Sequence, residues 1–226
     1  MDVTSRLDRR QALMAGAAMA GLGLMASTLP AYAQRRQGPA EVPVDELMKP
    51  GDLPDLVLGP DTAKVTVVEY ASMTCGHCMA FHTKVFPEIK SKYIDTGKIR
   101  FVFREFPLDS RAFAASMLAR CAGSTEKSLA LVGALFDTQE SWAFVKENPT
   151  PKLFEIAKQA GFTQESFDKC LTDQKLLDQL TAIHTRGNEV FGVNATPTFV
   201  INGKRLQAAP VLEEFEKVID PLLAQG

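Results

Sequence analysis

Two cysteines, Cys75 and Cys78, are separated by two residues in the segment VVEYASMTCGHCMAF. Thiols at this spacing can form a redox-active disulfide, a structural disulfide or half of a zinc site. A zinc site with four cysteines needs a second closely spaced pair, which the remaining cysteines, Cys121 and Cys170, do not supply. The pattern therefore favours redox chemistry.

The position of the pair indicates which cysteine would react. Only a thiolate attacks a disulfide, so a redox catalyst must lower the pKa of one cysteine. An apolar run precedes the pair and helical periodicity begins at about Gly76, which places Cys75 at a helix N-terminus. The helix dipole and the free N–H groups of the first turn stabilise a thiolate there. We expect Cys75 to be the exposed nucleophile, with His77 as a nearby donor or positive charge and Cys78 as the resolving thiol.

A metal site is the alternative from a different chemical class. Cys75, His77, Cys78 and His82 together offer soft ligands that suit a copper ion, as in a thiol metallochaperone. We expect redox chemistry without a bound metal or cofactor. The metal content of purified, reduced protein separates the two interpretations.

The elements around the pair alternate between strand and helix. Residues 64–71 form a β-branched apolar run between turn residues, which predicts a strand buried on both faces. Helical spacing follows as far as Gly97, with a kink expected at Pro87. Ile99, Phe101 and Phe103 then alternate with positions that include Arg100 and Arg104, which is typical of a second strand. A strand, a helix and a strand make a βαβ unit whose two strands are parallel.

The rest of the chain predicts helices and then a hairpin. Residues 110–190 contain several helical stretches and no convincing strand. Residues 198–201 and 204–206 predict two strands around an Asn202-Gly203 turn of the type that hairpins favour. A final amphipathic helix follows. The sequence therefore predicts an α/β fold with a long helical insertion.

These features together resemble the DsbA-like thiol-disulfide oxidoreductases, a family with the thioredoxin fold. The resemblance covers roughly residues 55–224. It rests on the CxxC motif between the first core strand and the first helix, the helical insertion, and Thr196-Pro197 before the third strand. It implies a central mixed sheet flanked by helices, with the helical insertion between a βαβ half and a ββα half.

The expected organisation begins with a segment that has the pattern of a signal peptide. An Arg pair at positions 9 and 10 precedes an uncharged apolar stretch, and an A-x-A cleavage site ends at Ala33. The Arg pair also resembles the twin-arginine export motif. An ordinary secretory signal and a membrane anchor are the alternatives. The expected parts are a cleaved signal peptide (1–33), an extended lead-in (34–54), the βαβ half (55–109), the helical insertion (110–190) and the ββα half (191–226).

The resemblance assigns roles to three residues outside the CxxC motif. Glu69, six residues before Cys75, matches a buried acid behind the active site, where it could exchange a proton with Cys78 through water. Pro197 matches a proline that is cis in the family and lies against the active-site disulfide. Thr196 would offer backbone groups that pair with a substrate strand.

Three other residues are candidates for structural roles. The spacing of Cys121 and Cys170 resembles that of an extra, non-catalytic disulfide in one DsbA subgroup, and two buried free thiols are the alternative. His184 lies on a helix that already has an apolar face, so we expect a packed or surface histidine.

The resemblance also implies a cellular role. The implied function is that of a soluble periplasmic oxidase, cleaved near Ala33/Gln34, that introduces disulfides into unfolded or reduced exported proteins and is reoxidised by a membrane partner resembling DsbB. We expect a monomer, and the net charge of −2 argues against binding nucleic acid. Gly76 and Thr196 are typical of isomerases of this fold. An isomerase or reductase is therefore the alternative enzyme, and a binding module without turnover is an alternative of another class.

Overall fold

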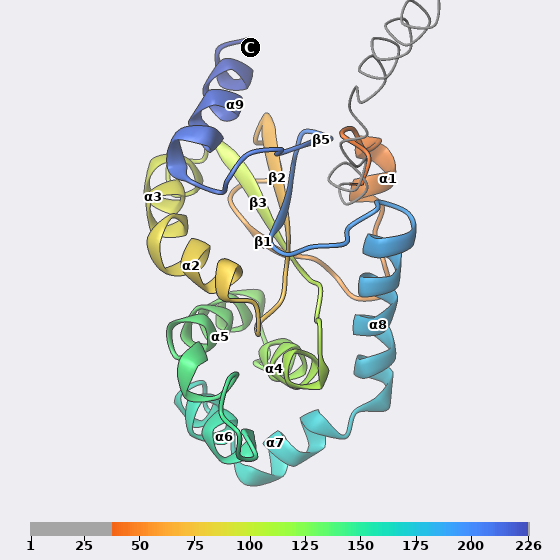
Figure 1. Cartoon of the computed structure of the whole chain (residues 1–226), viewed down its shortest axis with the longest axis vertical. Coiled ribbons are helices and arrows are strands. Elements are labelled where there is room, and N and C mark those ends of the chain that lie inside the picture. The colour runs from red at the N-terminus through yellow and green to blue at the C-terminus, as the bar shows by residue number, and fades with distance from the viewer. Residues whose placement is uncertain (1–37, 226) are drawn as a thin grey trace, which may run out of the picture. The chain divides into compact units, whose positions relative to one another are not determined.

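A five-stranded mixed sheet forms the centre of residues 38–225, the part of the chain that the computed structural model describes (Figure 1). The predicted signal peptide lies outside these residues. The sheet order is β1-β3-β2-β4-β5. The strands are β1 (Leu56–Leu58), β2 (Val65–Ala71), β3 (Ile99–Glu105), β4 (Thr198–Ile201) and β5 (Lys204–Arg205).

The two central strands pair in parallel, as the sequence predicts. β2 and β3 are in register from Val65 opposite Ile99 to Ala71 opposite Glu105. β4 lies antiparallel on the other side of β2, and the β4–β5 turn has Asn202 and Gly203 at positive φ, as a tight hairpin turn requires. Both faces of β2 are buried, which explains its almost continuous apolar sequence.

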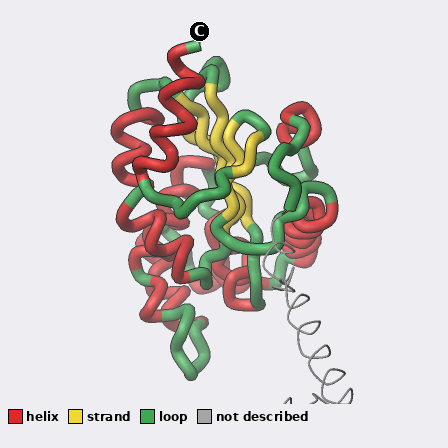
Figure 2. Tube along the Cα trace, turned by 45° about the horizontal axis from the view of Figure 1, so that its top comes forward, coloured by secondary structure: helices red, strands yellow, loops and turns green. Residues whose placement is uncertain are grey.

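Helices cover both faces of the sheet. Figure 1 shows α2, α3 and α9 on one side of the sheet and α1 and α8 on the other, and Figure 2 shows the strands enclosed between them. No helix within residues 38–225 is long and apolar enough to cross a membrane. The helices are α1 (Val44–Met48), α2 (Gly76–Lys84), α3 (Phe86–Ile89), the π-helix η1 (Lys90–Ile94), α4 (Ser110–Arg120), α5 (Thr125–Asp137), the 3₁₀-helix η2 (Gln139–Ser141), α6 (Thr150–Gln159), α7 (Gln164–Leu171), α8 (Gln174–Glu189) and α9 (Leu212–Ala224).

Alternate residues of β2 serve two separate apolar cores. Val67 and Ala71 belong to the larger core, which includes Phe81 of α2. Val68 and Tyr70 belong to a smaller core on the other face. Because side chains alternate along a strand, the odd-numbered positions of β2 face the helix that follows the cysteine pair.

The segment between β3 and β4 is helical, as expected for residues 110–190. It holds α4 to α8 and η2. A disulfide joins Cys121, at the end of α4, to Cys170 in α7, with a Cα–Cα distance of 6.1 Å. The architecture is that of a thioredoxin fold with a helical segment between its two halves.

The lead-in before the sheet differs from the extended segment that the sequence predicts. Within residues 38–54 the structure has helix α1, and Val42 and Leu47 are buried in the smaller core. Two arginines that lie far along the sequence bind the backbone carbonyls of this lead-in: Arg205 contacts Pro39, and Arg186 contacts residues 46 and 49. Prolines and glycines suggested an extended chain, but these distant contacts fold it against the sheet.

Strand β1 was not predicted from the sequence. It has three residues and pairs antiparallel with β3, from Leu56 opposite Phe103 to Leu58 opposite Phe101. A run of three apolar residues carries too little periodicity to identify a strand. Its position at the sheet edge depends on β3, which lies more than 40 residues further along the chain.

One buried ion pair ties the helical segment to the sheet, and its removal tests that connection. Arg120 of α4 forms two hydrogen bonds with Glu105 of β3, and the two side chains are 5% and 0% exposed. We expect Arg120→Met to lower the free energy of unfolding by about 3 to 5 kcal/mol, because Glu105 would be left as a buried, unpaired charge. Denaturant unfolding measures this change.

The matched control is an exposed pair on the same helical segment. Nζ of Lys152 lies 2.8 Å from Oε2 of Glu155, and both side chains are about half exposed. Lys152→Met should change the free energy of unfolding by less than about 0.5 kcal/mol. Equal effects of the two substitutions would show that the Arg120–Glu105 pair does not hold the segment.

Candidate redox-active site

Cys75 lies at the N-cap of α2, between the end of β2 and the first helical turn. Its Sγ accepts a hydrogen bond from the Cys78 backbone N–H at 3.4 Å, and both cysteines are free thiols. Cys75 is partly exposed, whereas Cys78 is fully buried. Gly76 and His77 are exposed between them. One thiol of the pair is therefore accessible and the other is not.

The surroundings of Cys75 favour its thiolate. A hydrogen bond with the Cys78 thiol, supported by the backbone N–H groups of Cys78 and His77, lowers the pKa of Cys75 to about 5 against the opposing effect of burial. His77 acts here through its backbone N–H, not through the side chain that we expected to be a donor or positive charge. At pH 7 the Cys75 sulfur is therefore mostly ionised.

The surroundings of Cys78 have the opposite effect. Burial raises the pKa of Cys78 well above its ordinary value, and the hydrogen bond with Cys75 and the negative charge of Glu69 raise it further. The two thiols, one helical turn apart, thus differ strongly in acidity. This difference suits an exposed nucleophile and a protonated, protected partner.

The loop before β4 lies against the cysteine pair. The Thr196–Pro197 peptide bond is cis, and the Thr196 carbonyl oxygen lies 3.3 Å from Cys75 Sγ, where it accepts a hydrogen bond when the thiol is protonated. Both residues are partly exposed. Thr196, 121 positions beyond Cys75, therefore meets it at the molecular surface.

Glu69 is fully buried on β2 and has one hydrogen-bonding partner among the described residues. Its Oε2 lies 2.9 Å from Nε2 of His82, while its Oε1 has no partner. His82, which the copper interpretation grouped with the cysteines, instead pairs with this carboxylate. Within residues 38–225 no group of three or more His, Cys, Asp or Glu side chains is arranged to hold a metal ion.

Gln139 is a site residue that sequence reasoning missed. It is 1% exposed, and its Nε2 donates hydrogen bonds to the carbonyl oxygens of Met73 at 2.8 Å and Cys75 at 3.1 Å. Gln139 therefore anchors the backbone of the reactive loop to the helical segment. In the sequence Gln139 is only a single glutamine near the end of a predicted helix. Nothing in its distance from Cys75 along the chain indicated that the two residues are in contact.

A second anchor joins the same loop to α4. Thr74 donates a hydrogen bond from Oγ1 to Oδ2 of Asp109 at 2.7 Å, while Oδ1 of Asp109 accepts from the N–H of Ala112 and caps the helix. One carboxylate thus begins α4 and holds the residue before Cys75. The helical segment positions the reactive thiol from two sides.

His184 takes no part in these contacts. Its ring stacks on Phe106 with centroids 4.1 Å apart, and burial lowers the pKa of His184. It is a packed histidine of α8, as the sequence suggested.

Known sequences with similarity to this chain are named for disulfide chemistry. A family described as Thioredoxin matches residues 52–221. A relative from Rickettsia bellii, named provisionally as a protein-disulfide oxidoreductase, is 39% identical over 152 residues, which are 66% of this chain and 57% of that protein. Disulfide bond formation protein D of Bacillus subtilis is 26% identical over 73% of this chain and 75% of its own length.

Solved structures show the same fold. The chain is similar to alpha-DsbA1 of Wolbachia pipientis, with 35% identity and a TM-score of 0.74 over 80% of this chain and 96% of that one. Oxidised BdbD of Bacillus subtilis has the same fold, with a TM-score of 0.68 at 23% identity over 82% of this chain and 97% of that one. The chain spans between 55 and 61% of the length of the Rickettsia relatives that it matches.

The difference in acidity between the two thiols can be measured by alkylation of the reduced protein. Because the thiolate is the form that reacts, we expect the iodoacetamide rate at Cys75 to titrate with a midpoint near pH 5. Cys78→Ala removes the hydrogen bond from the neighbouring thiol, so its midpoint should lie higher. Peptide mapping identifies the alkylated residue.

Cys75→Ser is the control for that measurement. It should remove the rapid phase, because Cys78 is buried and its pKa is raised. A wild-type midpoint near the ordinary thiol value, at about pH 8.5, would contradict the site geometry.

Proposed function

Because this chain belongs to the DsbA-like thiol-disulfide oxidoreductases of the thioredoxin fold, we propose that it donates the Cys75–Cys78 disulfide to newly exported polypeptides in the periplasm. The observation that carries the proposal is the low pKa of Cys75, about 5, beside a buried Cys78 with a raised pKa. Only one sulfur of the pair is then a good leaving group.

The reaction has two exchange steps. A substrate thiolate attacks Sγ of Cys75 and breaks the Cys75–Cys78 bond, so that Cys78 leaves and takes up a proton. A second substrate thiolate then attacks its own chain's sulfur in the mixed disulfide and releases Cys75 as a thiolate. Two electrons pass from the substrate to the protein, and the substrate gains one disulfide.

The acidity of Cys75 supports the direction of oxidation. A stabilised thiolate favours the reduced protein over its disulfide, and this makes the disulfide a stronger oxidant. Gly76 and Thr196, which are typical of isomerases of this fold, favour the other direction. Isomerisation or reduction is therefore the alternative outcome of the tests below.

The Thr196-Pro197 loop supports a polypeptide as the substrate. Thr196 presents its backbone beside Cys75, where an extended substrate segment can pair with it, and Pro197 offers no N–H. Substrates would be unfolded or reduced exported proteins that contain cysteines. A membrane protein resembling DsbB would reoxidise the pair, and the oxidase would act as a monomer.

The predicted signal peptide supports a periplasmic location for the protein. The pattern of residues 1–33 is that of a signal peptide, and disulfide donors act in oxidising compartments. Cleavage near Ala33 would release a protein with its four cysteines in that compartment.

The redox potential of the Cys75–Cys78 pair tests the direction of exchange. Equilibration with glutathione buffers should give a value between about −120 and −180 mV, because thiol pairs with a strongly acidic nucleophile are oxidising. The fraction oxidised is read by mass after alkylation. A value near about −270 mV would identify a reductase instead.

Single-cysteine variants test which sulfur meets the substrate. Cys75→Ser should abolish oxidation of a reduced, unfolded protein. Cys78→Ala should retain covalent mixed disulfides with its substrates, since the resolving thiol is absent. Oxidation by Cys75→Ser at the wild-type rate would overturn the proposed mechanism.

A further inference from the structure

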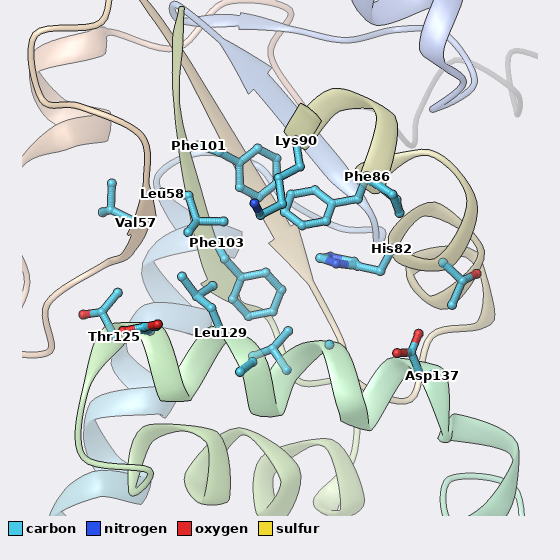
Figure 3. A pocket seen from close by; sticks show the side chains of 16 residues that line it. Val57, Leu58, His82, Phe86, Lys90, Phe101, Phe103, Thr125, Leu129 and Asp137 are labelled. Carbon is cyan, nitrogen blue, oxygen red and sulfur yellow. The ribbon is translucent and has the colours of Figure 1, made fainter. Parts of the chain in front are cut away.

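A cavity of about 630 Å³ lies between α5, the strands β1 and β3, and the α2–α3 turn (Figure 3). Its wall is largely apolar and includes Phe86, Phe101 and Leu129. His82 also lies on this wall. Of the residues that the structure describes, neither Cys75 nor Cys78 lines the cavity. The cavity is therefore separate from the surface where Cys75 is exposed.

Glu69 stands behind His82 in an apolar environment. On β2 it is in register with Phe103 and Phe199, and its side chain has no exposure to solvent. It faces the side of the sheet that α2 covers, and its charge contributes to the raised pKa of Cys78. A buried carboxylate with one unpartnered oxygen costs free energy, so packing alone does not account for it.

His82 connects this carboxylate to the cavity. Its side chain is 7% exposed, its Nε2 lies 2.9 Å from Glu69 Oε2, and its ring stacks on Phe136 with centroids 4.3 Å apart. The imidazole has two nitrogens, so it can accept a proton at one and release a proton from the other. Glu69 does not line the cavity, and His82 is the group that joins the two.

We propose that His82 relays protons between Glu69 and this cavity, so that the buried Cys78 gains and loses its proton without using the substrate surface. His82 is thus a positioning residue that acts through Glu69. The inference rests on the proposed thiol-disulfide exchange, in which Cys78 alternates between a protonated thiol and a disulfide sulfur.

The relay accounts for the proton that Cys78 loses when the protein is reoxidised. Starting from a mixed disulfide on Cys75, the Cys78 thiol gives its proton through an intervening water to the Glu69 carboxylate. The Cys78 sulfur attacks Sγ of Cys75, the internal disulfide forms, and the bond to the partner's sulfur breaks, so that the partner leaves as a thiolate. His82 holds one proton on Nε2, in its hydrogen bond to the Glu69 carboxylate, and a second on Nδ1. As Glu69 takes up the proton from Cys78, Nδ1 of His82 releases its own proton to the cavity, so that one proton leaves for each proton taken up. Oxidation of a substrate runs the same steps in reverse.

The charged groups around His82 come from three elements. Glu69 of β2 bonds the ring directly, Lys90 of η1 lines the cavity, and so do Glu126 and Asp137 of α5. Lys90 forms an exposed ion pair with Asp95. Among the described residues, His82 has its hydrogen bond with Glu69, so a change at Lys90 leaves the relay in place and serves as a control.

The test separates formation of the mixed disulfide from its resolution. Reduced protein is mixed with oxidised glutathione, quenched in acid after milliseconds to seconds, and weighed to distinguish the glutathione adduct from the internal disulfide. We expect His82→Gln to form the adduct at the wild-type rate and to resolve it at least about tenfold more slowly at pH 7. Lys90→Gln should match the wild type in both steps.

The pH profile distinguishes proton relay from packing. Without the relay, resolution in His82→Gln should rise by about tenfold per pH unit, because it waits for free Cys78 thiolate, while the wild-type profile is flatter. Glu69→Gln should show the same slow resolution as His82→Gln, and the double variant should be no slower. A His82→Gln profile equal to that of the wild type would overturn the proposal.

Chemical rescue gives an independent readout. In His82→Ala, imidazole can enter the cavity and should restore rapid resolution, whereas pyrazole, a ring of the same size but far lower basicity, should not. Equal rescue by both rings would show that His82 only fills space and would overturn the proposal. If the wild type formed no adduct at all, the proposed function would fail instead, so the two failures are distinguishable.

Discussion

A hydrogen bond from the Cys78 thiol to the Cys75 sulfur, one helical turn before it, is the interaction on which the rest of this site depends. The thiol of Cys78 stabilises the thiolate of Cys75, and this bond is the largest influence on the acidity of Cys75. It requires that Cys78 stay protonated, which burial ensures. The protein therefore needs a helix that begins at the surface and enters the core within one turn. The strand β2 and the helix α2 supply that geometry.

The surroundings of Cys75 come from segments far apart in the sequence. The cis Thr196–Pro197 peptide lies on one side, and Gln139 and Asp109 hold the backbone of the loop from the helical segment. Because β4 pairs with β2, the loop before β4 must end beside the loop after β2. The sheet topology thus brings these parts together, while the side chains adjust the acidity.

Local patterns allowed much of this arrangement to be predicted from the sequence. Strands β2 and β3, the start of α2 and the Asn202-Gly203 turn depend on periodicity and turn chemistry that neighbouring residues determine. Glu69 was identified by its position six residues before Cys75, but Gln139 and the pairing of Glu69 with His82 depend on contacts across the fold that the local sequence does not indicate. His82 shows the difference clearly. Its spacing suggested a metal ligand grouped with Cys78, and the three-dimensional structure gives it a carboxylate as its partner.

Burial that protects Cys78 also creates a difficulty. A thiol with no exposure cannot exchange protons with water at its own position, yet each redox cycle adds and removes one proton there. Substrate polypeptides occupy the exposed side of the pair during that exchange. A proton route through Glu69 and His82 avoids this competition between substrate and water. Disulfide exchange then takes place at the surface, while the proton moves to and from the cavity. The cost of burying Glu69 beside two phenylalanines is consistent with such a use, because an apolar residue at that position would pack at least as well.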